Sequence, residues 1–193
     1  MNFSFTNSQN DNSFSINCNG QLIDLSKPKL MGILNLTPDS FSDGGKFNSE
    51  KNALKQAENL LENGATFIDI GAQSTRPNAE YLNADEEIRR IGNVISLIKK
   101  EFPESLISLD TFYADVVKFG FDEGIDLVND ISAGQFDSEL LDVVSKTGLP
   151  YILMHINPSY KSMHEKIKFD DIILSINRFF SEKLLELNKK GIK

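Results

Sequence analysis

The chain has one cysteine, two histidines and fewer basic than acidic side chains, and these shortages exclude several classes of protein. Cys18 cannot form an internal disulfide, so we expect a cytoplasmic protein in which Cys18 is a small residue of a surface hairpin. Lys and Arg number 20 against 28 Asp and Glu, and the net charge of −8 argues against general nucleic-acid binding. The charge of an anionic ligand must therefore be met locally, by a metal ion, an arginine or backbone N–H groups.

Long apolar runs are also missing. No stretch approaches the roughly 18 residues that a membrane span requires, so we expect no membrane association. The first ten residues have no basic segment followed by an apolar one, which argues against a signal peptide. The 193 residues suffice for one domain with a sizeable core, and no long linker divides them.

Residues 1–29 are predicted to form a separate N-terminal unit. Apolar residues alternate with polar ones on both sides of an Asn/Asp/Ser-rich segment, and Asn19-Gly20 offers a second tight turn. We interpret this unit as a β-hairpin cap over one end of the core.

From residue 30 onward, strand and helix patterns alternate without interruption. Apolar runs typical of parallel strands covered on both faces occur at 30–34, 66–70, 106–109, 126–128 and 151–154. Apolar residues at helical spacing predict helices near 54–61, 88–102, 114–121, 138–146 and 172–187. Asn83, followed three residues later by Glu86, resembles a capping box that opens the second of these helices.

This alternation is typical of a doubly wound sheet or of a TIM-type (β/α)8 barrel. In a doubly wound sheet the ligand lies where the strand order reverses, so only a few loops carry chemistry. Here every strand ends in polar residues: Asn35, Ser74–Arg76, Asp110-Thr111, Asn129-Asp130 and His155. Five strand ends that meet at one site favour the barrel. A barrel needs eight units and about 250 residues, so residues 30–193 are expected to be a truncated barrel of about five βα units.

Taken singly, these polar residues have ordinary structural explanations. Asn35 can cap a strand end, and Asp110-Thr111 can cap a helix. An isolated loop arginine such as Arg76 is usually only solvated, and Met154 can be an ordinary core residue. The order in which they occur along the chain decides the interpretation.

Together the motifs resemble those of dihydropteroate synthase. They are Asn-Leu-Thr-Pro-Asp-Ser-Phe-Ser-Asp-Gly-Gly at 35–45, Gly-Ala-Gln-Ser-Thr-Arg-Pro at 71–77, Ser-Leu-Asp-Thr at 108–111, Val-Asn-Asp-Ile at 128–131 and Leu-Met-His at 153–155. That family joins 6-hydroxymethyl-7,8-dihydropterin pyrophosphate to para-aminobenzoate and releases pyrophosphate, in folate biosynthesis. The motifs occur in the family's order and cover nearly all of the chain after the hairpin.

The resemblance implies a role for the first strand end and the loop after it. Asn35 matches the amide that contacts Mg²⁺ beside the substrate's pyrophosphate, and an uncharged oxygen suits an ion that takes its other ligands from phosphate and water. The loop from Thr37 to Gly45 resembles a lid that closes on the second substrate. Phe41 and Asp43 would help to build the para-aminobenzoate pocket.

The second loop resembles a phosphate-binding segment. Arg76 is a fork-shaped donor suited to phosphate oxygens, Thr75 adds a hydroxyl, and Pro77 stiffens the turn. Two residues depart from the family pattern. Gln73 stands where Glu is usual, which keeps the shape but loses a charge, and Asn78 stands where Gly is usual.

The later strand ends resemble the part of the site that binds the pterin ring. Asp110 and Asn129 match the carboxylate and amide that bind the donors and acceptors along the ring edge. Met154 would lie against the ring face. Asp130 and His155 are interpreted as structural.

The implied reaction is alkyl transfer to an amine, with Asp43, Arg76 and Asp110 as catalytic residues and no covalent enzyme nucleophile. The family's remaining site groups come from later strands, so we expect the 193-residue chain alone to be inactive and the full-length protein to be a homodimer. Two alternatives remain open. One is a non-catalytic or degenerate pterin-binding fragment, and the other a pterin-dependent methyltransferase of the corrinoid kind. The lid loop and Arg76 count against the methyltransferase.

Overall fold

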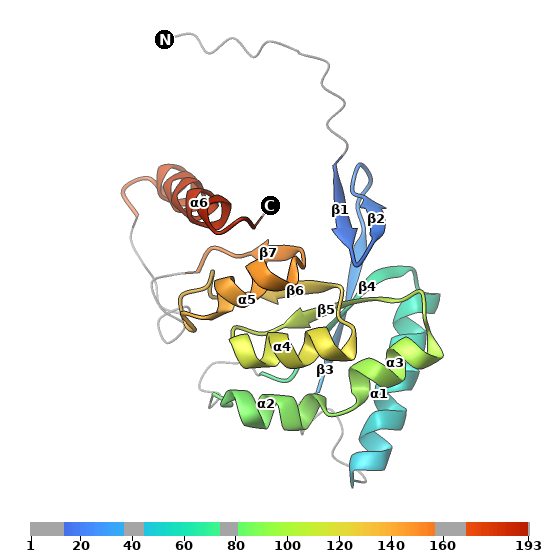
Figure 1. Cartoon of the computed structure of the whole chain (residues 1–193). Helices are drawn as coiled ribbons and strands as arrows, with labels where there is room; N and C mark the ends of the chain where they lie inside the picture. Colours follow the sequence, from blue (N-terminus) through green and yellow to red (C-terminus); the bar gives the residue numbers. More distant parts are fainter. Residues whose placement is uncertain (1–13, 37–44, 74–80, 157–168, 193) are drawn as a thin grey trace.

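A five-stranded parallel sheet organises the fold, with its strands adjacent in chain order (Figure 1). The computed structural model describes residues 14–36, 45–73, 81–156 and 169–192, apart from the side chains of residues 45–49. The strands are β3 (Leu30–Asn35), β4 (Ala65–Gly71), β5 (Leu106–Asp110), β6 (Leu127–Asp130) and β7 (Tyr151–Leu153). All five predicted strands are confirmed, and because their order never reverses, the sheet is that of a (β/α) barrel.

Helices follow the strands along the chain, and all but the last of them cover one face of the sheet (Figure 1). They are α1 (Gly45–Glu62), α2 (Ala84–Ile91), α3 (Val94–Glu101), α4 (Ala114–Glu123), α5 (Leu140–Thr147) and α6 (Ile172–Lys189). Leu34, Ile70, Leu109 and Val128 occupy one register level of four neighbouring strands, and all four are buried in the core beneath the helices. Since strand side chains alternate between faces, the residues next to them project from the opposite, inner face.

The prediction of a single helix near 88–102 is wrong, because the chain turns at Gly92 and forms the two helices α2 and α3 instead. Gly92 has φ 51°, which favours glycine, and its N–H closes α2 on the carbonyl of Ile88. The predicted N-cap is confirmed, since Oδ1 of Asn83 accepts from the N–H of Glu86 at 2.9 Å. The capping box is only half formed, because the Glu86 carboxylate binds Arg89 and Arg90.

An antiparallel hairpin of β1 (Ser15–Cys18) and β2 (Gln21–Asp24) stands at the amino end of the sheet (Figure 1). Its turn has positive φ at both Asn19 and Gly20, which matches the twist of paired strands. The first half of the predicted alternation, residues 1–13, lies outside the described residues. Cys18 is not a surface residue, because it lies on the hairpin face that covers the sheet end and is 1% exposed. It packs with Ile23, Phe67 and Leu106.

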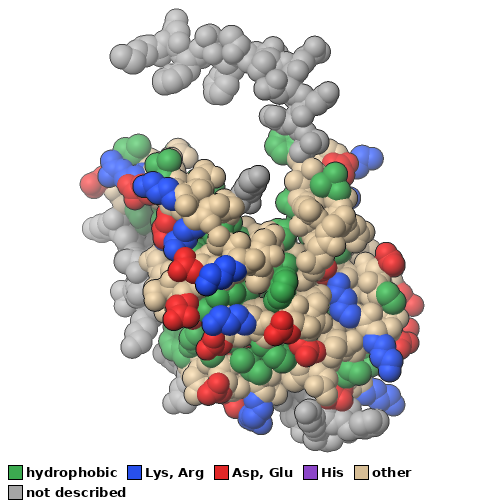
Figure 2. Space-filling view, in the orientation of Figure 1, with side chains coloured by type: hydrophobic (Ala, Val, Ile, Leu, Met, Phe, Trp, Pro, Cys, Tyr) green, Lys and Arg blue, Asp and Glu red, His purple; other side chains and the backbone are tan. Residues whose placement is uncertain are grey.

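The described surface carries charges of both signs. In Figure 2 the Lys and Arg side chains on the visible face lie among Asp and Glu side chains. Two ion pairs of the described residues are Lys118–Asp115 and Lys190–Asp142. None of the helices in the described part of the chain is long and apolar enough to cross a membrane.

Candidate active site

The structure brings three predicted site residues to one level at the carboxyl ends of the strands. Asn35 of β3 pairs in register with Gly71 of β4, Gly71 with Asp110 of β5, and Asp110 with Asn129 of β6. Each directly follows a residue that is buried beneath the helices, so all four belong to the inner face. The site is thus assembled from four consecutive strands.

The glycine in this row makes room for the Asp110 carboxylate. A Cβ atom at Gly71 would lie 3.2 Å from Oδ2 and 3.3 Å from Cβ of Asp110, closer than most side chains tolerate. A larger residue at position 71 would require the Asp110 side chain to shift by a few tenths of an ångström. The close approach of Asp110, rather than a turn of the backbone, therefore explains why glycine occupies position 71.

One level below this row is a carboxylate that the sequence interpretation missed. Asp69 of β4 is 7% exposed, and it accepts hydrogen bonds from the Ser108 hydroxyl at 2.5 Å and from the Asn129 side-chain amide at 3.0 Å. Asp69 lies in the middle of an apolar run, so the pattern marked only a strand. Its partners are 39 and 60 residues away along the chain, and nothing local signals the contact.

Asp110 lies in an acidic environment. Burial, together with the nearby carboxylates Asp69, Glu87 and Asp130, raises its pKa to about 7. Among the described residues it makes no side-chain hydrogen bond, and it does not cap α4, because the first N–H of that helix donates to Asp137 at 2.8 Å. The helix-cap alternative for Asp110-Thr111 is therefore wrong for Asp110, whereas the Thr111 hydroxyl accepts from the N–H of Tyr113, the residue before α4, at 3.2 Å. A positively charged group placed beside this carboxylate would be stabilised.

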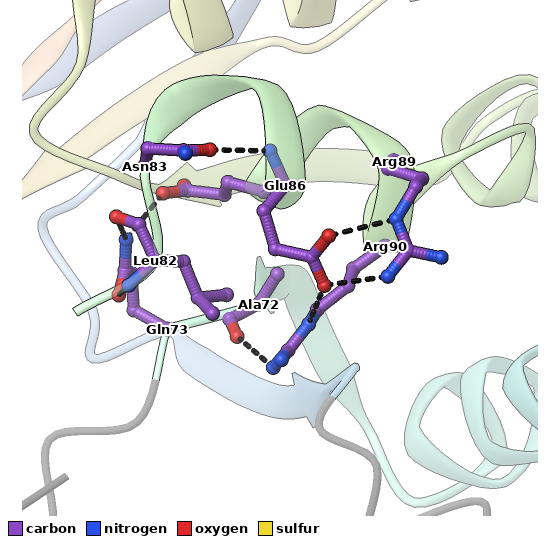
Figure 3. Close-up of polar contacts among 8 residues, drawn as sticks. Ala72, Gln73, Leu82, Asn83, Glu86, Arg89 and Arg90 are labelled. Carbon is purple, nitrogen blue, oxygen red and sulfur yellow. Dashed lines mark hydrogen bonds and ion pairs between the residues drawn. The ribbon is translucent and has the colours of Figure 1, made fainter. Parts of the chain in front are cut away.

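Gln73, one of the two departures from the family pattern, is bonded to Leu82, two residues before α2 (Figure 3). Its Oε1 accepts from the Leu82 N–H at 3.2 Å, and its Nε2 donates to the Leu82 carbonyl at 3.0 Å. Nε2 also donates to Oε2 of Glu87 at 2.8 Å. The amide therefore joins the residue that follows β4 by two positions to the residue that precedes α2 by two positions.

Glu87 is a second buried carboxyl that the sequence interpretation missed. It is fully buried on α2, where burial raises its pKa while hydrogen bonds from Thr111 and Gln73 lower it. The amide at position 73 suits this neighbour, because it donates where a carboxylate would repel.

We expect Gln73→Glu to destabilise the chain by about 2 kcal/mol at pH 8 and by less at pH 5, because two adjacent buried carboxyls must then share a proton. The pKa of such a pair is raised in the folded state, so its stabilising contribution is present at low pH and is lost as the pH rises. Thermal unfolding at both pH values measures this. Gln73→Met is the control: it removes the hydrogen bond to Glu87 without adding a carboxyl, so its deficit should grow less between pH 5 and pH 8 than that of Gln73→Glu. An equal deficit for Gln73→Glu at both pH values would contradict the assignment.

Two further residues have the contacts of structural groups. Asp130 accepts from the N–H groups of Ser132 and Gly134 and from the Tyr151 hydroxyl, each at 2.6 Å. His155 packs edge-on against Phe179 with the ring centroids 4.8 Å apart. These contacts agree with the structural interpretation of both residues. Met154 is half-buried just after β7, and its predicted contact with a ring stays a prediction.

Part of the predicted site lies outside the described residues: Phe41, Asp43, Thr75, Arg76, Pro77 and Asn78. Their roles stay predictions. Within the described ranges, no group of three or more His, Cys, Asp and Glu side chains could hold a metal ion. Asn35 is exposed at the end of β3, and its amide oxygen fits an ion that takes one protein ligand and its other ligands from phosphate and water.

Comparison with known proteins shows the family of the chain. The model of the pterin binding enzymes matches residues 31–193. The chain belongs to this family. It is 41% identical over 173 residues to dihydropteroate synthase of Escherichia coli strain K12, a match that covers 90% of this chain and 61% of that protein. The chain therefore spans about three fifths of the length of this curated relative.

Solved structures of pterin binding enzymes share the fold. Dihydropteroate synthase of Xanthomonas albilineans with 4-aminobenzoic acid superposes with a TM-score of 0.83 at 33% identity, covering 94% of this chain and 63% of that one. The same enzyme in complex with 7,8-dihydropteroate gives a TM-score of 0.78 at 31% identity, covering 93% of this chain and 62% of that one.

Proposed function

We propose that the protein is a dihydropteroate synthase, which condenses 6-hydroxymethyl-7,8-dihydropterin pyrophosphate with para-aminobenzoate to give 7,8-dihydropteroate and pyrophosphate. The alignment of Asn35, Asp110 and Asn129 at one level of neighbouring strands carries this proposal. The X. albilineans complexes with 4-aminobenzoic acid and with 7,8-dihydropteroate support it.

In the proposed mechanism the chain's carboxylates act on the pterin. Asp110 and Asn129 bind the ring edge, and the negative field of Asp110, Asp69 and Glu87 favours positive charge at the exocyclic methylene. The methylene C–O bond breaks, pyrophosphate leaves with the bonding electrons, and the amine of para-aminobenzoate forms the new C–N bond. The amine then loses a proton to solvent. Arg76 of the second loop would bind the leaving phosphates.

The proposal also includes a metal ion, a cellular compartment and an oligomeric state. Asn35 would hold Mg²⁺, which supplies positive charge for the pyrophosphate oxygens. Asp43 and Phe41 would close over para-aminobenzoate. We place the protein in the cytoplasm as a homodimer whose partners are its small-molecule substrates.

The first experiment is the intact mass of the protein from its natural source, together with the reading frame beyond Lys193. That protein is then assayed for pyrophosphate release from the dihydropterin substrate. We expect release that depends on para-aminobenzoate. Pterin binding without turnover would instead support the degenerate fragment, and methyl transfer to a corrinoid would support the methyltransferase alternative.

A further inference from the structure

A cluster of three hydrogen-bonded residues on three neighbouring strands joins the proposed pterin site to the level beneath it. Asp69 of β4 accepts from the Ser108 hydroxyl of β5 at 2.5 Å and from Nδ2 of Asn129 of β6 at 3.0 Å. Asp69 and Ser108 are buried, and Asn129 is half-buried. Both carboxylate oxygens of Asp69 are therefore occupied by donors from other strands.

Burying the Asp69 carboxylate at this position costs desolvation free energy. Asp69 shares its register level with Ile33, Ser108 and Leu127, a level that aliphatic side chains fill in the interior of a barrel. A buried carboxylate loses its hydration and regains it only through donated hydrogen bonds. An aliphatic residue at position 69 would avoid that cost, so packing alone does not account for the aspartate.

The carboxylate removes an ambiguity in Asn129. The two ends of an asparagine amide have almost the same shape but opposite hydrogen-bonding character. An ionised carboxylate only accepts, so Asn129 must turn its NH₂ group toward Asp69. Asp69 lies two residues closer to the amino end of the strands than the row of Asn129, and the amide oxygen therefore points away from it, toward the carboxyl edge.

We propose that Asp69 is a positioning residue that fixes the orientation of the Asn129 amide, so that the site presents an amide oxygen beside the Asp110 carboxylate. Two neighbouring acceptors select a ring edge that carries adjacent N–H donors, as an aminopyrimidinone does. The identity of that ligand rests on the proposed function, whereas the orientation of the amide does not. The specificity of the site is then set one layer below the groups that touch the ligand.

Binding of 6-hydroxymethylpterin to the protein as its source encodes it tests the proposal. We expect Asp69→Asn to weaken binding about tenfold, because an amide at position 69 also accommodates the reversed orientation and turns a donor toward the ring. In the Asn129→Ala background the same change should cost less than twofold, since no amide remains to be oriented. A tenfold loss in both backgrounds would assign Asp69 a general structural role and overturn the proposal.

The chain offers a matched control at the other end of the sheet. Asp126 is also a buried carboxylate that accepts from an asparagine amide, that of Asn19, at 3.2 Å. Asp126→Asn should leave pterin affinity within twofold in the folded protein, although it breaks the ion pair that Asp126 forms with Lys99 at 2.5 Å. A tenfold loss in this variant would show that the pterin site responds to any buried change.

A second measurement does not depend on the ligand. In ¹⁵N-labelled protein, one side-chain amide proton of Asn129 should be shifted downfield by its bond to the carboxylate, and the shift should disappear in Asp69→Asn. Unchanged amide resonances would overturn the proposal even if the protein binds no pterin. Absent pterin binding with the expected amide shift would instead contradict the proposed function alone.

Discussion

Asp110→Asn is expected to lower turnover about 100-fold or more and at the same time to raise the stability of the folded protein above pH 7. In the proposed mechanism the carboxylate supplies the negative charge that favours the transition state, and a neutral amide cannot replace it. Steady-state kinetics at pH 8 measure the loss. The exposed carboxylate of Asp115, five residues later on α4, provides the matched control, since Asp115→Asn should leave turnover unchanged.

The gain in stability follows from the environment of Asp110. Its pKa of about 7 in the folded state lies well above the value of about 4 in an unfolded chain. A group with a raised pKa favours the folded state at low pH, and this contribution is lost as the pH rises through about 7. Removing the charge should therefore stabilise the protein by roughly 2–4 kcal/mol at pH 8 and by less at pH 5. Thermal unfolding at both pH values measures this gain.

The same pKa predicts how activity depends on pH. In the proposed mechanism pterin binding uses the ionised carboxylate, so kcat/KM should rise as the pH passes through about 7 and then level off. The Asn variant should retain its low activity without this step. A rise of the same shape in the variant would mean that another group titrates, and would remove Asp110 from its assigned role.

The positions of Asn35, Asp110 and Asn129 were predictable because parallel strands direct their carboxyl ends to one edge. An apolar run followed by a polar residue therefore marks both a strand and a site residue. Asp69 was not predictable by this rule, because it lies inside a run and its importance depends on the register of three strands. Only the three-dimensional structure shows this register, which brings Asp69 within hydrogen-bonding distance of Ser108 and Asn129.

Helix α2 shows a second limit of sequence patterns. The apolar stripe from Ile88 to Phe102 keeps helical spacing across Gly92, so periodicity alone predicts one helix, whereas the glycine ends it by adopting φ 51°. Glu87 lies in the same helix among other charged residues and gives no sign that it is buried. Its burial follows from the tertiary contact with Gln73, which the spacing of neither residue indicates.

A polypeptide of residues 1–193 produced alone is expected to show no turnover and to self-associate. β3 and β7 are the outer strands of the described sheet, and each leaves one edge without a strand partner there. Leu30 and Ile33 of β3 are each 62% exposed. Unpaired edges and exposed apolar side chains promote association between chains. The family's late-strand residues, which complete the site in the resemblance, are absent from such a polypeptide.

Sedimentation together with the pyrophosphate-release assay tests this expectation. We expect species well above 21.6 kDa and no release that depends on para-aminobenzoate. The matched control is a chimera in which residues 1–193 are continued by the remaining part of the E. coli relative, because that segment would pair with both free edges and supply the missing groups. A monomer of residues 1–193 that turns over would contradict the prediction, since it would mean that five strands suffice for the site.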